Sequence, residues 1–374
     1  MLKGLKWLLS TLTGLAILLV ALLTISRHLP LPQDEAKALE SMAIQPASWQ
    51  HPEHNAFPAV WFLAYDGIAP SEQPALLAED LARQKQGMAA TPAEPMMESI
   101  AAERFTRVKP DIPRWCGRDV PSCLAQVREH ADEVAATHDG HDALHARIAA
   151  LGQYTHMRSP FVQDLNMPIP QFGLLLERTS SLALAHVRGD SASALQGVCE
   201  DTSAARMLMR DGDNLITAMI GGAWAQRSAD LFTEIVAELP SDTALPVQCR
   251  IAFAPVEVKE MDLCQPLRGE FAFQATALRP EHVPMHQRWQ FNARKTQART
   301  AWLLSRSCAE PVQAQIRAGQ PVRLPEPRPT WTLDCADNVV GCVLMGIQSP
   351  NYEEYLHRMQ KSGAALKRAS ESLP

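Results

Sequence analysis

The first residues of this chain form a stretch that is long and apolar enough to cross a lipid bilayer. From Trp7 to Ile25, nineteen consecutive residues carry no charge. An α-helix rises about 1.5 Å per residue, so this stretch extends roughly 28 Å, close to the ~30 Å thickness of a hydrocarbon core. We therefore expect residues 1–28 to hold one transmembrane helix with its span at 7–25.

The span is expected to remain attached as an anchor. A cleaved signal peptide has an apolar core of about 7 to 15 residues followed by small residues at the cleavage site. Ser26, Arg27 and His28 follow the span instead, and no Ala-x-Ala lies there. Lys3 and Lys6 precede the span, so the positive-inside rule predicts a cytoplasmic N-terminus and an inner-membrane protein whose remaining chain is periplasmic.

The charge balance bears on the class of partner. The chain has 374 residues with 35 Lys plus Arg against 41 Asp plus Glu, and no basic stripe is visible in the sequence. This balance gives no electrostatic basis for binding nucleic acid. After the span, we expect a proline-rich juxtamembrane linker at 29–58 and one helical periplasmic domain at 59–374.

Eight cysteines suit an oxidising compartment. The short spacings suggest three disulfides, Cys116 with Cys123, Cys249 with Cys264, and Cys335 with Cys342. Nothing in the sequence pairs Cys199 and Cys308. Buried, unpaired cysteines in a helical core are the alternative.

The pattern of apolar residues predicts an all-α fold. Apolar residues recur at helical spacing over 174–187, 192–210, 214–227 and 229–239, with short breaks at 188–190, 211–213 and Ser228. Glycine can end a helix and aspartate can cap the next one, so Gly189-Asp190 and Gly212-Asp213 predict helix ends. Short breaks favour a bundle of antiparallel helical hairpins, resembling tetratricopeptide repeats in the centre although no second copy at their period is found.

A histidine-rich segment offers the sharpest candidate chemistry. If the helix is continuous, His138, His141 and His145 lie on one face of it, where imidazoles could bind zinc, copper or nickel. The alternative is a turn at Gly140 that separates them onto two helices. Further along, Glu257, Glu260 and Asp262 form an acidic cluster that we interpret as a solvated loop rather than an acid–base pair.

Known catalytic motifs are missing from the sequence. It has no Gly-x-Ser-x-Gly elbow, no His-Glu-x-x-His, no phosphate-binding loop and no dinucleotide fingerprint. The sequence therefore predicts no catalytic residue and no cofactor, and it favours a protein that is not an enzyme.

Several segments carry a resemblance to other proteins. The segments concerned are Asn55–Pro70, Trp115–Val127, the Gly-Asp region as far as Ile220, and Asn338–Tyr355. Together they resemble a loosely defined group of uncharacterised proteobacterial inner-membrane proteins with a single span and a helical periplasmic domain. One departure is Cys342 after Gly341, where the group has a basic residue. The resemblance implies a Gram-negative inner membrane and no particular activity.

These observations lead to two hypotheses. The first is a membrane-anchored periplasmic module that binds a partner protein through grooves between hairpins, in envelope assembly or in protection against a toxin. The second is a periplasmic hydrolase or metal-binding protein that uses the helix of His138, His141 and His145.

Overall fold

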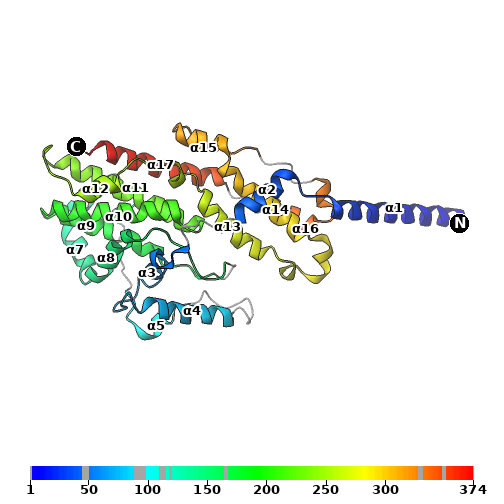
Figure 1. The fold of residues 1–374 in the computed structure, drawn as a ribbon, viewed down its shortest axis with the longest axis horizontal. Coiled ribbons are helices and arrows are strands. Elements are labelled where there is room, and N and C mark those ends of the chain that lie inside the picture. Colours follow the sequence, from blue (N-terminus) through cyan, green and yellow to red (C-terminus); the bar gives the residue numbers. More distant parts are fainter. Residues whose placement is uncertain are drawn as a thin grey trace. The chain divides into compact units, whose positions relative to one another are not determined.

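The fold consists of helices joined by turns and loops. A computed structural model describes residues 2–43, 50–87, 98–108, 115–117, 120–163, 167–326, 332–347 and 351–373 (Figure 1). Within these ranges the chain forms α-helices and short 3-10 helices and no strand. The predicted all-α class is confirmed.

The chain divides into two compact units, each built from segments that are distant in sequence. Unit 1 contains residues 1–44, 271–306 and 324–351, and unit 2 contains 45–270, 307–323 and 352–374. The boundary falls inside helix α13 (Cys264–Ala277). The linker predicted at 29–58 includes α2 (Gln33–Ala43), which packs on α14 (Ala293–Ser305) and is therefore part of the folded unit 1.

Unit 2 has its core where α10 (Ser191–Asp211), α11 (Leu215–Glu238) and α17 (Tyr352–Glu371) pack together. α11 buries Trp224 and Phe232 completely. α9 (Arg178–Val187) also packs on α10. The other α-helices of this unit are α3 (Phe57–Trp61), α4 (Gln73–Gly87), α5 (Ala101–Arg104), α6 (Cys123–Glu129), α7 (Ala131–His138), α8 (Asp142–Ala149), α12 (Val247–Ala252) and α15 (Glu310–Arg317).

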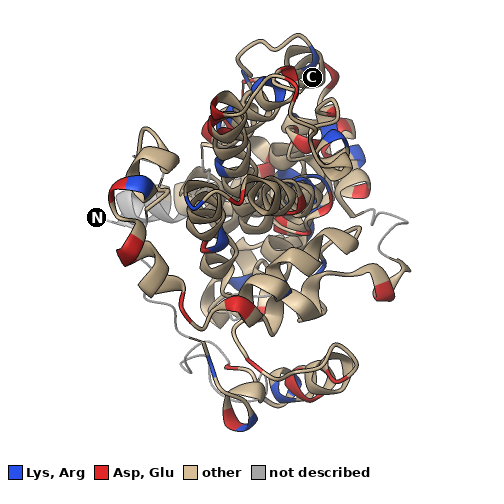
Figure 2. Cartoon of the chain, turned by 90° about the vertical axis from the view of Figure 1, so that its left-hand side faces the viewer, with Lys and Arg blue, Asp and Glu red and all other residues tan. Residues whose placement is uncertain are grey.

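Lys and Arg positions are interspersed with Asp and Glu positions along the helices, as the colours of the cartoon in Figure 2 show. Many are paired on the surface, for example Arg128 with Glu238 at 2.7 Å and Arg368 with Asp230 at 3.3 Å. Such exposed pairs contribute little to stability, so the core rather than the surface holds this unit together.

The helix ends follow the predicted capping chemistry in part. Gly189 has a φ of +94° and Asp190 accepts a hydrogen bond from Ser193 N, as predicted. Ser122 caps α6 by accepting a hydrogen bond from Ala125 N. At the second Gly-Asp pair the predicted helix end is confirmed, because α10 ends at Asp211, but the predicted capping residue is wrong. Gly212 has an ordinary φ of −70° and Asn214 caps α11, while a side chain at Gly212 would meet the carbonyl of Leu208.

The break predicted at Ser228 is also wrong, because α11 continues through it to Glu238. Ser228 is buried within the helix packing, and a lone serine does not stop a helix that has tertiary contacts along its length.

Unit 1 combines α1 (Leu2–His28), α2, α14, α16 (Val339–Ile347) and the end of α13. A small apolar cluster of Leu278, Val283 and Phe291 is covered by Val340 and Leu344 of α16. α1 is one continuous helix. Its part from Ser10 to His28 is long and apolar enough to cross a membrane, and the side chains of this part are almost all exposed.

Four disulfides join all eight cysteines. Cys116–Cys123 and Cys335–Cys342 are the predicted pairs. The predicted pair Cys249–Cys264 is wrong, because Cys249 bonds to Cys199 and Cys264 bonds to Cys308. The reason is that α12 packs on α10, which places Cys249 against a cysteine 50 residues earlier in the chain.

Candidate functional site

The three predicted histidines lie on two helices and the turn between them. His138 ends α7, His141 precedes α8 and His145 lies within α8, because Gly140 adopts a φ of +75° and ends the first helix. The rings of His138 and His145 approach to 5.1 Å between centroids. The turn at Gly140 is therefore the correct alternative, although it still brings two of the three rings together.

Burial keeps these two rings neutral. It lowers the pKa of His138 to about 4, helped by the neighbouring rings of His145 and His141. It also lowers the pKa of His145 to about 4, helped by the positive charge of Arg178. The Nε2 atom of His138 lies 2.8 Å from the Ser180 hydroxyl.

The geometry gives no support to a metal site here. In the part of the chain that the structure describes, no group of three or more His, Cys, Asp or Glu side chains could hold a metal ion. Arg178, which influences His145, is a cation held by Asp201 at 2.7 Å and Glu200 at 3.0 Å. A positive charge acting on His145 opposes the binding of a metal cation by this ring.

The acidic cluster at 257–262 is not the solvated loop expected. Glu260 is almost completely buried and forms a paired hydrogen bond with the guanidinium of Arg206 at 2.7 and 2.8 Å. Arg206 also donates to the carbonyls of Ala252 and Ala254. This arrangement fastens α10 to the loop after α12, so its role is structural.

A hollow of about 330 Å³ lies on unit 2 beside α3. Trp61 and Tyr65 form an aromatic part of its wall, and Arg107 contributes a positive charge paired with Glu98 at 2.6 Å. The other lining residues are Ala64, Ser99, Ile169, Pro170 and Gln171.

The walls of this hollow are held in place by a buried carboxylate. Asp80 accepts hydrogen bonds from Trp61 Nε1 at 2.8 Å, from the Ser99 hydroxyl at 2.6 Å and from Ile100 N at 2.8 Å. The Trp61 ring is fixed in orientation before any ligand arrives, which reduces the entropy lost on binding.

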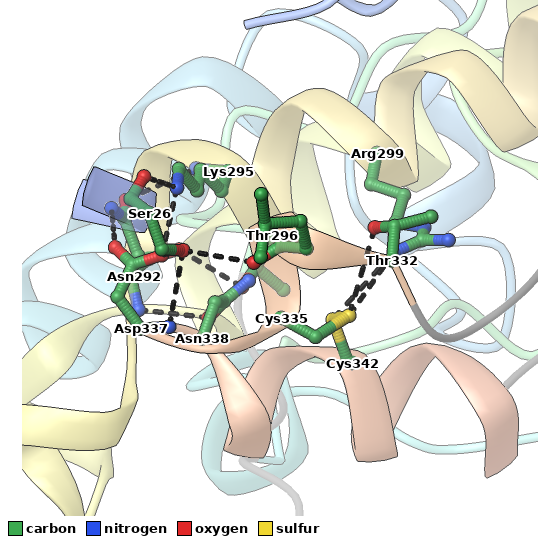
Figure 3. A network of polar contacts seen from close by, with 11 residues as sticks. Ser26, Asn292, Lys295, Thr296, Arg299, Thr332, Cys335, Asp337, Asn338 and Cys342 are labelled. Carbon is green, nitrogen blue, oxygen red and sulfur yellow. Dashed lines mark hydrogen bonds and ion pairs between the residues drawn. A yellow bond between two sulfur atoms is a disulfide. The ribbon is translucent and has the colours of Figure 1, made fainter. Parts of the chain in front are cut away.

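A second polar site joins α1 to the rest of unit 1 (Figure 3). Ser26, near the end of α1, is completely buried and donates through its hydroxyl to Asp337 at 2.5 Å. Lys295 of α14 donates to Asp337 at 2.7 Å and also to the carbonyl of Ser26. Asn292 donates to the second oxygen of Asp337 at 3.0 Å.

These contacts keep Asp337 ionised. Burial alone would raise the pKa of Asp337, but the hydrogen bonds from Lys295, Ser26 and Asn292 outweigh it and lower the pKa. The carboxylate thus connects the end of α1 with the start of α14. No sequence motif marks Asp337 or Lys295, so the sequence does not predict either as a site residue.

Comparison with known proteins identifies no relative. No protein-family model, no curated protein and no solved structure matches this chain.

Proposed function

We propose that this chain is a single-pass inner-membrane protein whose periplasmic helical hairpins bind a partner protein of the cell envelope. The supporting observation is the burial of Ser26 in unit 1. The last turn of α1 is part of the folded unit, so removing the preceding residues as a signal peptide would leave a new terminus inside this packed site.

The disulfides and the flanking charges support the proposed orientation. Four disulfides are stable only in an oxidising compartment, and the periplasm is one. Lys3 and Lys6 precede the span, which favours a cytoplasmic N-terminus.

The hollow beside α3 is the proposed binding site for the partner. Tryptophan, tyrosine and arginine dominate the binding energy of protein interfaces, and Trp61, Tyr65 and Arg107 meet here. Its volume suits one or two side chains that protrude from a partner. The Ser99 hydroxyl donates to Asp80, so this serine supports the wall rather than acting as an activated nucleophile.

Crosslinking in living cells tests the proposed site. A photo-reactive residue at Gln171, which lines the hollow, is expected to give one discrete protein adduct. The same residue at Glu129, an exposed position on α6, is the matched control and is expected to give none. Arg107→Ala should remove most of the adduct. Equal adducts from both positions, or none from Gln171, would contradict the proposal.

Topology and processing are tested separately. The mass of the purified protein should include residues 1–28, and a C-terminal alkaline phosphatase fusion should be active. A mature chain that begins after residue 25, or a fusion active only as a cytoplasmic reporter, would refute the anchored periplasmic arrangement.

A further inference from the structure

A second hollow lies in unit 1, beside the C-terminal end of the apolar stretch of α1. It has a volume of about 290 Å³ and is open to solvent. Arg27 immediately follows the buried Ser26, and Arg294 lies in the first turn of α14. The complete lining is Arg27, Trp289, Phe291, Asn292, Ala293, Arg294 and Asp337.

The charge of this hollow is positive. Arg27 and Arg294 are exposed, and neither forms an ion pair with any residue that the structure describes. The carboxylate of Asp337 does not neutralise them, because Lys295, Ser26 and Asn292 already use its oxygens. Two guanidinium groups around one open hollow favour an anion that fits between them.

Aromatic and apolar side chains surround the same place. Trp289 is 59% exposed, and its Nε1 donates to the His286 carbonyl at 2.9 Å, so the ring keeps a free face. Leu333 is 54% exposed, and its carbonyl oxygen lies 3.1 Å from the Ser26 hydroxyl oxygen. Exposed tryptophan and leucine are costly in water but favourable at the boundary between lipid and water.

The position of the hollow along α1 selects the source of the anion. The first charged residue after the apolar stretch is Arg27, and the hydrogen bonds of Ser26, directly before it, fix this turn of α1 to unit 1. If α1 spans the bilayer, Arg27 and Trp289 must lie at the level of the lipid headgroups. A phosphate at that level belongs to a lipid.

We propose that the hollow lined by Arg27, Trp289 and Arg294 binds the phosphate of an anionic phospholipid headgroup. This inference rests on the membrane anchoring proposed above. The guanidinium groups would hold the phosphate oxygens, and the ring of Trp289 would lie beside the glycerol and upper acyl chain. The bound lipid would set the height of unit 1 on the membrane.

Native mass spectrometry of the full chain tests this site. The protein is released from detergent after incubation with equal amounts of phosphatidylglycerol and phosphatidylcholine. The wild-type chain should retain phosphatidylglycerol preferentially, and Arg27→Gln with Arg294→Gln should weaken that retention about thirtyfold. The matched control is Lys37→Gln with Arg279→Gln, which removes the same charge from exposed positions of unit 1 outside the hollow and should retain the lipid.

The outcomes separate this proposal from the anchoring on which it rests. Alkaline carbonate extraction is performed first, and release of the chain would refute the anchoring and this site together. If the chain stays in the membrane, two results would overturn the lipid site alone. One is equal lipid binding by wild type and R27Q/R294Q, and the other is no preference for phosphatidylglycerol. Displacement of the lipid by an equal concentration of glycerol phosphate would assign the hollow to a soluble phosphate instead. An unchanged thermal midpoint and an intact Cys335–Cys342 disulfide would show that the variant is folded.

Discussion

The ammonium group of Lys295 lies 2.7 Å from the carboxylate of Asp337, and both side chains are more than nine-tenths buried. The two residues are 42 positions apart, and Ser26, about 270 positions before Lys295, completes the same group of hydrogen bonds. The contact therefore unites three distant segments of unit 1 at the end of the proposed membrane anchor. Its loss should loosen that anchor from the folded unit.

Asp337→Ala is expected to destabilise unit 1 strongly. It leaves the ammonium of Lys295 buried without a counter-charge, and breaking one side of a buried pair costs about 3–5 kcal/mol. Thermal unfolding of the full chain in detergent, followed by circular dichroism, should show an early transition. Glu354→Ala, which removes an exposed pair with Arg358, is the control and should cost less than about 1 kcal/mol. Equal losses of stability in the two variants would show that the buried pair stabilises unit 1 no more than an exposed pair does.

The sequence predicted the helices that have one apolar face and a clear end. α9 and α10 are of this kind, because their apolar residues recur at helical spacing and Gly189-Asp190 marks the boundary between them. α16 was missed because nearly all its residues are apolar, so it shows no alternation between a buried and a solvated face. Ser228 led to the prediction of a break that is absent, because a polar residue inside a buried helix resembles a helix end in the sequence.

The sites were harder to predict than the helices, because their residues come together only through tertiary packing. Lys295 and Asp337 are ordinary charged residues in the sequence, and only the folded chain places them opposite each other. The histidines were conspicuous in the sequence, yet their number and spacing could not show that Gly140 divides them or that Arg178 lies near His145. Sequence proximity likewise favoured the wrong partner for Cys249.

Peptide mapping without reduction should recover Cys199 linked to Cys249 and Cys264 linked to Cys308. Replacing Cys199 and Cys249 together by alanine should lower the free energy of unfolding by about 4 kcal/mol, because the bond closes a long loop. The same replacement of Cys335 and Cys342, which are only 7 positions apart, should cost about 2 kcal/mol. Recovery of a Cys249–Cys264 peptide would contradict the packing of α12 on α10.

Gly221→Ala should weaken the contact between α10 and α11. A Cβ atom at Gly221 would lie 2.8 Å from Met209 N and 2.9 Å from the Ala205 carbonyl, and backbone cannot move aside as a flexible side chain can. We expect a loss of about 1–3 kcal/mol in denaturant unfolding. Gly173→Ala is the matched control, since nothing lies within 4 Å of a Cβ atom there and its φ is ordinary. If the two variants unfold alike, the helix crossing is looser than the structure shows.

The buried histidine pair predicts a loss of stability in acid. The pKa of His138 and that of His145 are about 4 in the folded chain against 6.5 when exposed, so between these values the unfolded state binds more protons. The contribution of the two rings to the free energy of unfolding should therefore be fully present above pH 6.5 and should fall as the pH drops towards 4. We expect a slope on the order of 1 kcal/mol per pH unit, which is less than two fully buried rings would give, because the rings keep some contact with solvent. His138→Gln should roughly halve this slope in thermal unfolding between these limits, whereas His286→Gln, at an exposed position, should leave it unchanged. If stability depends on pH in the same way in His138→Gln as in the wild type, other groups cause the acid sensitivity.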